Sequence, residues 1–344
     1  MNFANFWYVV ALSDQLTAKT VLSRIVLDEW LVIFRDPQGN PVALQDRCLH
    51  RNSRLSAGKL KNGQLQCPYH GWQYDAEGHV VTVPAEGPRD PNKRQCPHVA
   101  RKAVSYAARE KDGYVYVKLS NTSPEAAPFA MPYYKAVGWE TVRVVNRFQN
   151  TVTNCVENFI DIPHTASVHP GIFRNPQQQP LRMRVIRYEG TVTATYSQET
   201  KNLGWFSWFL NPKGKEIKHI DQFFMPNVTS VEYGMGPTRR CFITSQSVPE
   251  TKESTLVYTD VTFNYGLWNT LARPFVRLTA QRIIAQDVAA LKLQQETIEK
   301  YGEHFSHTPV DTIHVFVESI RGAIAQGKDP RNLPDKSVDL TFWV

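Results

Sequence analysis

Two short segments of this 344-residue chain each place a cysteine close to a histidine. The first pair is Cys48 and His50, and the second pair is Cys67 and His70, with sixteen residues between the pairs. Turn-forming residues flank both pairs, so each pair is predicted to lie on a loop between strands. Thiolates and neutral imidazoles are metal ligands, and two pairs in the same order indicate one shared inorganic centre.

Two inorganic centres could use these four ligands. Structural zinc sites usually take their ligands as Cys-x₂₋₄-Cys and His-x₃₋₅-His pairs rather than as mixed pairs. A Rieske [2Fe–2S] cluster needs mixed pairs, because two cysteines bind one iron and two histidines bind the other. The spacing therefore favours a Rieske cluster, and a structural zinc protein is the alternative.

A second group of metal-ligand residues lies downstream, at Asp161, His164 and His169. Two imidazoles and a carboxylate are typical of mononuclear non-haem Fe(II), which keeps coordination positions open for dioxygen. Asp161 and His164 would share one face of a helix, whereas His164 and His169 would diverge on a regular one. Pro163 and Pro170 make an irregular helix possible, so the spacing allows a metal site without requiring it.

A further carboxylate, Asp287, lies in a segment with helical periodicity. Asp287 lies beside the predicted apolar stripe, where an acid is costly unless it is paired or binds a metal. A boundary acid that reaches Lys292 or solvent is the alternative, and Glu296 is a less favoured substitute. The stripe is formed by Leu278, Ile283, Ile284, Val288, Leu291 and Ile298.

Both groups resemble motifs of one family. Cys-Leu-His-Arg at 48–51 and Cys-Pro-Tyr-His-Gly-Trp at 67–72 resemble the cluster motif of Rieske non-haem iron oxygenases. Asn-x-x-Asp-x-x-His-x₄-His at 158–169 is similar to the catalytic motif of the same family. Rieske proteins of respiratory complexes carry an extra cysteine in each loop, and this chain has Tyr69 instead in the second loop.

The resemblance implies a role for each residue. Cys48, His50, Cys67 and His70 would bind the cluster, and His164, His169 and Asp287 would bind the mononuclear iron. Asp161 matches the bridging carboxylate, which would bond His164 and reach a cluster histidine, by position His70, of a neighbouring subunit. Asn158 matches a nearby polar residue.

The resemblance also implies a reaction. The length is similar to that of the short, homotrimeric type, such as vanillate and dicamba O-demethylase oxygenase components. Such an enzyme would use O₂ and NAD(P)H-derived electrons to hydroxylate, or O- or N-demethylate, a small, largely apolar or aromatic molecule. A separate reductase, with or without a ferredoxin, would deliver the electrons, since Gly234–Pro237 lacks the features of a dinucleotide-binding turn. The alternatives are a ring cis-dihydroxylating dioxygenase, a Rieske desaturase, and a Rieske electron-transfer protein.

The pattern of short strands followed by mixed strands and helices predicts an α+β protein in two domains. We expect an all-β Rieske domain over 1–123 and a mixed antiparallel-sheet-plus-helix catalytic domain over 124–344. Aromatic segments at 204–210 and 223–225 are candidate walls of a substrate pocket.

The composition of the chain indicates which partners and which cellular compartment to expect. The net charge is +7, but no block of basic residues indicates nucleic acid binding. Five scattered cysteines favour a reducing, cytoplasmic environment, and Cys96, Cys155 and Cys241 are interpreted as ordinary thiols. No apolar run is long enough to predict a membrane span, and the apolar stretch Phe3–Leu12 lacks the basic leader that a signal peptide would have.

Overall fold

The computed structural model divides the chain into two compact units, which are Ala4–Ala130 and Met131–Val344 together with Met1–Phe3. The expected domain boundary between residues 123 and 124 lies outside the described residues. The structure describes residues 1–87, 101–120, 127–170, 180–197, 217–235 and 239–344.

The unit Ala4–Ala130 consists of two antiparallel sheets. The six-stranded sheet has the order β1-β10-β9-β4-β3-β2, and the four-stranded sheet has the order β5-β6-β7-β8. Side chains of both sheets, including Phe34, Leu44, Leu65 and Tyr74, share one hydrophobic core with Cys48 and Cys67. The strands are β1 (Tyr8–Leu12), β2 (Leu22–Val26), β3 (Glu29–Arg35), β4 (Pro41–Gln45), β5 (Lys59–Lys61), β6 (Gln64–Gln66), β7 (Gln73–Tyr74), β8 (Val80–Thr82), β9 (Ser105–Lys111) and β10 (Tyr114–Lys118).

Residues 24–34 alternate apolar and polar side chains, a pattern that predicts one strand, and this prediction is wrong because the segment is divided between β2 and β3. The chain reverses after β2, because Leu27 and Asp28 both have positive φ, 53° and 63°. Two consecutive residues in that conformation make a tight hairpin turn that matches the twist of the flanking strands. Asp28 is a common turn residue but Leu27 is not, so the sequence carries only a weak signal for this turn.

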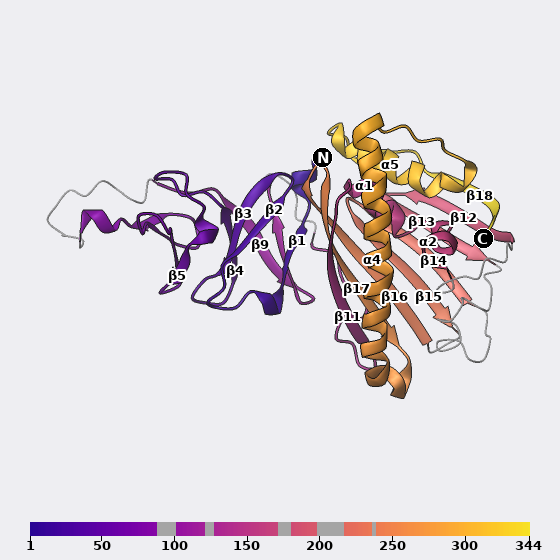
Figure 1. Ribbon diagram of the computed structural model, residues 1–344, viewed down its shortest axis with the longest axis horizontal. Helices are drawn as coiled ribbons and strands as arrows, with labels where there is room; N and C mark the ends of the chain where they lie inside the picture. Colours follow the sequence, from indigo (N-terminus) through magenta and orange to yellow (C-terminus); the bar gives the residue numbers. More distant parts are fainter. Residues whose placement is uncertain (88–100, 121–126, 171–179, 198–216, 236–238) are drawn as a thin grey trace. The chain divides into compact units, whose positions relative to one another are not determined.

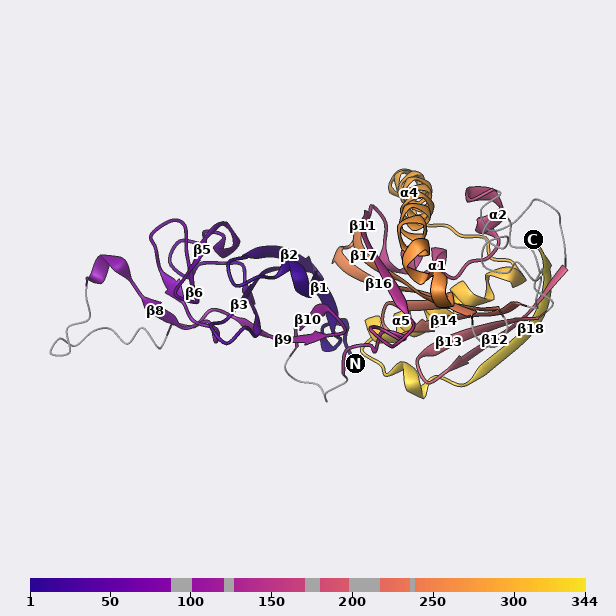
Figure 2. The same cartoon turned by 90° about the horizontal axis from the view of Figure 1, so that it is seen from below.

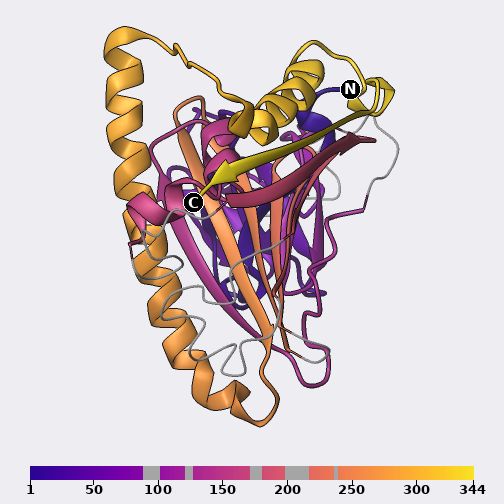
Figure 3. The same ribbon diagram turned by 90° about the vertical axis from the view of Figure 1, so that its right-hand side faces the viewer.

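The larger unit contains one eight-stranded antiparallel sheet with helices on one side (Figures 1 and 2). The strand order is β11-β17-β16-β15-β14-β13-β12-β18, and Figure 3 shows β18 beside β12 at the sheet edge. The strands are β11 (Glu140–Phe148), β12 (Pro180–Tyr188), β13 (Thr191–Ser197), β14 (Ile217–Phe224), β15 (Val228–Met235), β16 (Arg239–Thr251), β17 (Ser254–Asn264) and β18 (Lys336–Trp343). The predicted α+β class, an all-β unit followed by a sheet-plus-helix unit, is confirmed.

Four α-helices of this unit are described: α1 (Val152–Asn158), α2 (His164–Val168), α4 (Asn269–Tyr301) and α5 (Thr312–Ala325). The sequence pattern over residues 141–153 predicts a strand, but the strand ends at Phe148. Helix α1 begins four residues later, where the Thr151 side chain accepts a hydrogen bond from Asn154 N. The apolar stripe predicts a helix over about residues 274–300, and helix α4 begins earlier, at Asn269. Among the described helices, none combines the length and apolar character that crossing a membrane would need.

The length of α4 follows from the topology of β11 and β17. These strands are adjacent and antiparallel, so the end of β11, which leads to α1, lies beside the start of β17. Helix α4 follows the far end of β17 and must run back along the sheet to approach α1 (Figure 1). The nine positions of β11 span roughly 30 Å. The path from Asn269 to Asp287 covers roughly 27 Å of helix, which returns Asp287 to the end of the sheet that carries α1.

Candidate metal centres and substrate cavity

The first Cys/His loop follows β4 and is closed by its own backbone. Cys48 N donates to Ser53 O at 2.8 Å, and Asn52 N donates to Cys48 O at 3.0 Å. The buried carboxylate of Asp46 accepts hydrogen bonds from Arg54 Nε at 2.9 Å and from Ser56 N at 2.6 Å. These bonds fix both ends of the loop, which limits how far Cys48 can move.

The second Cys/His loop connects β6 and β7 in the small sheet. Cys67 N donates to Trp72 O at 2.8 Å, and Gly71 N donates to Cys67 O at 3.2 Å. Gly71 has φ 73°, and a Cβ there would lie 3.1 Å from both the Gln66 side chain and the Pro84 ring. Glycine is therefore required at this turn, which presents His70 at the tip of the loop.

The structure brings the four predicted cluster ligands together. Cys48 and Cys67 are each 2% exposed. The rings of His50 and His70 have centroids 4.5 Å apart, and the Trp72 ring stacks on His50 at 4.8 Å. Among the described residues, His50 Nδ1 is buried and has no hydrogen-bond partner. Two buried thiols beside two adjacent imidazoles, one with an unsatisfied nitrogen, fit the mixed ligand set of a Rieske cluster.

Tyr74 is a component of this site that the sequence did not reveal. Its hydroxyl donates to Cys48 Sγ at 3.2 Å and accepts from Leu49 N at 2.9 Å. Burial and the bond to Cys48 raise the pKa of the phenol above its usual range, so the donor proton is retained. A hydrogen bond to a cluster sulfur is one way a protein tunes a reduction potential.

In the larger unit, His164, His169 and Asp287 form what we call the His–His–Asp triad. One ligand atom from each residue lies within 4.8 Å of the other two. Asp287 Oδ1 lies 2.9 Å from His169 Nε2 and 3.6 Å from His164 Nε2. His169 and Asp287 are 1% and 3% exposed. Two imidazoles and one carboxylate that converge in a buried place fit the ligand set of a facial triad.

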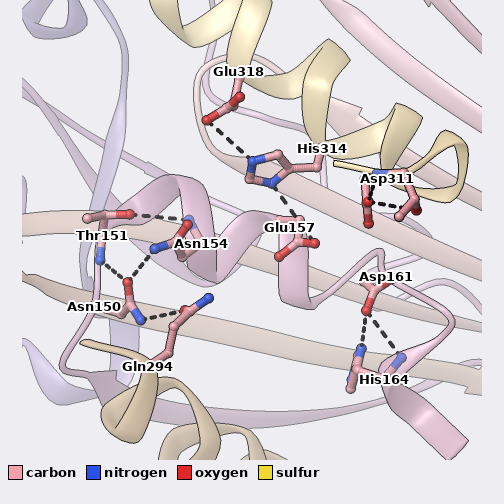
Figure 4. A network of polar contacts seen from close by, with 11 residues as sticks. Asn150, Thr151, Asn154, Glu157, Asp161, His164, Gln294, Asp311, His314 and Glu318 are labelled. Atoms are coloured by element: carbon pink, nitrogen blue, oxygen red, sulfur yellow. Dashed lines mark hydrogen bonds and ion pairs between the residues drawn. The ribbon is translucent and has the colours of Figure 1, made fainter. Parts of the chain in front are cut away.

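The remaining nitrogen of each triad histidine faces a polar side chain. His164 Nδ1 lies 3.2 Å from Asp161 Oδ2 (Figure 4), and His169 Nδ1 lies 2.9 Å from Gln286 Oε1. An acceptor at Nδ1 keeps the proton there and leaves Nε2 available for a metal. Gln286 was not predicted, because only the folded helix α4 brings it to His169.

Local structure explains why His164 and His169 converge. His164 is the first residue of α2, and its backbone N–H donates to Asp161 Oδ2 at 3.2 Å. His169 caps the end of α2 with non-helical dihedral angles, φ −119° and ψ 52°. The turn after α2 therefore redirects His169, which on a regular helix would point away from His164.

Asn158, the last residue of α1, lies beside Asp287 of α4. Asn158 Nδ2 donates to Asp287 Oδ1 at 3.5 Å, while Asn158 Oδ1 is buried without a partner among the described residues. Burial lowers the pKa of His169, but the bond to Asp287 and its negative charge outweigh burial, and the pKa is raised. The Asp287 carboxylate thus favours a positive charge at the triad, and a metal cation would supply that charge. Glu296, the alternative ligand, is exposed on α4 and lies 4.0 Å from Lys292.

The triad borders a cavity of about 840 Å³, a volume that includes its solvent-open mouth. Strands β14 to β17 and helix α4 supply a mostly apolar lining, which includes Val231, Ile243, Val261 and Ile284, and Ile160 adds to it from the segment after α1. Such a cavity suits a small apolar molecule held beside the triad. The candidate wall at 204–210 lies outside the described residues. The candidate wall at 223–225 does not line the cavity.

Strand β14 instead contributes a buried His–Asp pair to the cavity. His219 Nε2 lies 2.9 Å from Asp221 Oδ1, and the two residues are 1% and 2% exposed. The His219 ring stacks on Tyr196 and Tyr233, at 4.5 and 4.3 Å between centroids. This pair adds buried polar groups to the strand side of the lining, and the sequence did not predict it. The alternating His-x-Asp spacing, which places both residues on one face of a strand, was the available signal.

Two family models match the chain. Residues 6–106 match the Rieske [2Fe-2S] domain, and residues 148–317 match the vanillate O-demethylase oxygenase C-terminal domain. The chain belongs to the Rieske non-haem iron oxygenase family. The two matched segments contain the Cys/His loops and the His–His–Asp triad, respectively.

Sequence relatives lie within the same family. The chain is 31% identical over 203 residues to the methylxanthine N1-demethylase NdmA of Pseudomonas putida, a match that covers 56% of this chain and 55% of that protein. It is 33% identical over 193 residues to the oxygenase component of dicamba O-demethylase from Stenotrophomonas maltophilia, covering 55% and 54%. These matches span about half the length of the two relatives.

Solved structures show the same fold. Dicamba monooxygenase bound to 3,6-dichlorosalicylic acid superposes with a TM-score of 0.81 at 23% identity, covering 95% of this chain and 98% of that one. Pseudomonas putida NdmA gives a TM-score of 0.73 at 20% identity, covering 97% and 96%. The Rieske oxygenase fold thus extends over nearly the whole chain.

Proposed function

We propose that this protein is the oxygenase component of a Rieske monooxygenase that hydroxylates, or oxidatively O- or N-demethylates, a small and largely apolar or aromatic molecule. The observation that carries the proposal is the convergence of His164, His169 and Asp287 beside an apolar cavity. A protein that only carried electrons would have no use for either feature. The names of the relatives, an N1-demethylase and an O-demethylase, support demethylation.

In this proposal, the ligands divide into two sets. Cys48, His50, Cys67 and His70 hold the [2Fe–2S] cluster. His164, His169 and Asp287 hold Fe(II). When bound, the cluster supplies electrons one at a time, and the mononuclear iron keeps coordination positions open for O₂.

The chain's own residues then have distinct tasks. Asp161 and Gln286 accept hydrogen bonds from the Nδ1–H groups of His164 and His169. Both Nε2 atoms therefore stay unprotonated and point toward one position. The Asn158 amide donates to Asp287 and holds that carboxylate beside the histidines. The apolar lining of the cavity places the substrate next to the triad and excludes bulk water.

The proposal includes partners. A separate reductase, with or without a ferredoxin, supplies NAD(P)H-derived electrons. The working form is a cytoplasmic homotrimer in which the cluster of one copy serves the triad of the next, with Asp161 between them. The relation to short O-demethylase components supports this arrangement.

Metal analysis with spectroscopy tests the proposal. We expect a red-brown protein with about three iron atoms and about two acid-labile sulfides per chain. His70→Ala should abolish the Rieske paramagnetic signal and leave the mononuclear iron. A colourless protein without sulfide after anaerobic reconstitution would contradict the proposal. A screen for O₂ uptake and formaldehyde release then separates demethylation from dihydroxylation and desaturation, because removing a methyl group from oxygen or nitrogen releases formaldehyde.

A further inference from the structure

A second cluster of metal-ligand residues lies near the start of α5, apart from the His–His–Asp triad. His307, His314 and Glu318 each offer one ligand atom, and these atoms lie within 4.8 Å of one another. His314 and Glu318 are four residues apart on α5, so they occupy one helical face. His307 comes from the segment before the helix, and its ring centroid lies 5.1 Å from that of His314.

His314 is the buried member of this cluster. It is 6% exposed, and among the described residues neither of its ring nitrogens has a hydrogen-bond partner. The nearest carboxylate oxygens approach from opposite sides (Figure 4). Glu318 Oε1 is 3.3 Å from Nε2, and Glu157 Oε1 is 3.9 Å from Nδ1. A buried imidazole with two unsatisfied nitrogens is costly unless another group satisfies them.

The surroundings of His314 are rich in negative charge. Glu157, Asp161 and Asp311 line one small cavity with His314, and Glu318 lies beside the same imidazole. Carboxylates that crowd together in a partly buried place are costly unless positive charge offsets them. A bound divalent cation would supply that charge.

We propose that His307, His314 and Glu318 bind a divalent transition-metal ion of the Zn²⁺ type. Two imidazoles and a carboxylate, completed by water, are a usual ligand set for such an ion. Glu318 lies on the Nε2 side of His314, so Nε2 is the nitrogen that faces the metal. Glu157 on the Nδ1 side then forms the carboxylate–histidine–metal arrangement that fixes the tautomer of a ligating histidine. This site goes beyond the proposed oxygenase function, and neither inference depends on the other.

The competing arrangement is a protonated His314 held between the two glutamates, with no metal. It leaves the neighbouring His307 without a role, whereas a metal site uses both imidazoles. Metal binding separates the two arrangements.

The test is a Zn²⁺ titration of the iron-loaded protein under anaerobic conditions, followed by calorimetry and by metal counts after dialysis. We expect about one Zn²⁺ to bind per chain with the iron content unchanged. His307→Ala and Glu318→Gln should each weaken binding by more than tenfold, and Glu157→Gln should weaken it by about 10–100-fold. His304→Ala is the matched control, because His304 is exposed in the same segment but lies outside the cluster.

Three outcomes would overturn the proposal. One is the absence of stoichiometric Zn²⁺ binding, and another is unchanged affinity in His307→Ala. The third is the release of one iron for each Zn²⁺ bound, which would assign the binding to the triad. Since His307 is exposed, its replacement leaves the fold intact and keeps the test interpretable.

Discussion

Nδ1 of His164 lies 3.2 Å from Oδ2 of Asp161, and the same carboxylate oxygen accepts the backbone N–H of His164. One acidic side chain therefore fixes both the start of α2 and the tautomer of a predicted iron ligand. A carboxylate in this position orients the imidazole, and in the proposed function it would also offer a path for electrons into it.

Replacement of this carboxylate tests that path. Asp161→Asn keeps the size of the side chain and removes its charge. We expect both metal centres to remain and electron transfer between them to slow by roughly 10–100-fold. Single-turnover kinetics after reduction of the cluster measure this step, with iron and sulfide counts as the check on metal content. Wild-type rates would remove Asp161 from the electron path.

Asp287→Ala tests the triad. The buried carboxylate is the negative member of the predicted ligand set, so its loss should lower the iron content from about three to about two per chain and abolish turnover. The colour and paramagnetic signal of the cluster should remain. Glu296→Ala is the control, since that residue is exposed on the same helix and pairs with Lys292. Turnover retained in Asp287→Ala would exclude this residue as a ligand.

Tyr74→Phe tests the hydrogen bond to Cys48. A donor stabilises the more negative, reduced cluster, and a hydrogen bond of this kind is worth about 1 kcal/mol. Its removal should lower the reduction potential by roughly 40 mV, since 59 mV corresponds to a factor of ten for one electron. Tyr106→Phe removes a tyrosine hydroxyl that bonds Glu29 in the same unit, and it should leave the potential unchanged. Equal potentials in Tyr74→Phe and the wild type would contradict the prediction.

The buried acid Glu157 predicts a dependence of stability on pH. Its pKa is raised from 4.5 to about 8 in the folded protein. Between these values the unfolded chain has released the proton that the folded chain retains, so this group lowers the free energy of unfolding as pH rises from about 4.5 to 8.

Glu157→Gln should remove this loss. Above pH 8 the variant should be more stable than the wild type by up to a few kcal/mol, because one pKa unit corresponds to about 1.4 kcal/mol. Below about pH 4.5 the two proteins should be equally stable. Denaturant unfolding across this range, without added divalent metal, provides the measurement. A constant difference at every pH would point to packing rather than to ionisation.

Features that depend on local sequence were predictable. The Cys/His pairs, the residues Asp161 to His169 and the buried position of Asp287 follow from spacing and helical periodicity, and the structure places each group as a cluster. Even here the pattern was imperfect, because Leu278 of the predicted stripe is 67% exposed. The α+β class was also accessible, since strands and helices leave different periodicities.

Features that depend on contacts between distant segments were not predictable. Gln286 reaches His169 only because α4 packs beside α2. Tyr74 lies on β7 of the small sheet and reaches Cys48 in the loop that follows β4 of the other sheet. The partners of His314 are Glu157 on α1 and Glu318 on α5. Strands β12 to β17 lie between these two helices in the sequence. Strand β18 was not predicted; it pairs with β12 at the edge of the sheet and buries Phe342, which are both contacts between distant segments.

The adjacency of β11 and β17 has a consequence for how the protein folds. His164 and His169 follow β11 in the sequence. Asp287 follows β17, on helix α4, which runs back along the sheet. Contacts this distant in sequence form late and slowly. A growing polypeptide therefore has no complete His–His–Asp triad until synthesis has passed Asp287, so insertion of the proposed iron must wait until about the last sixth of the chain is being made.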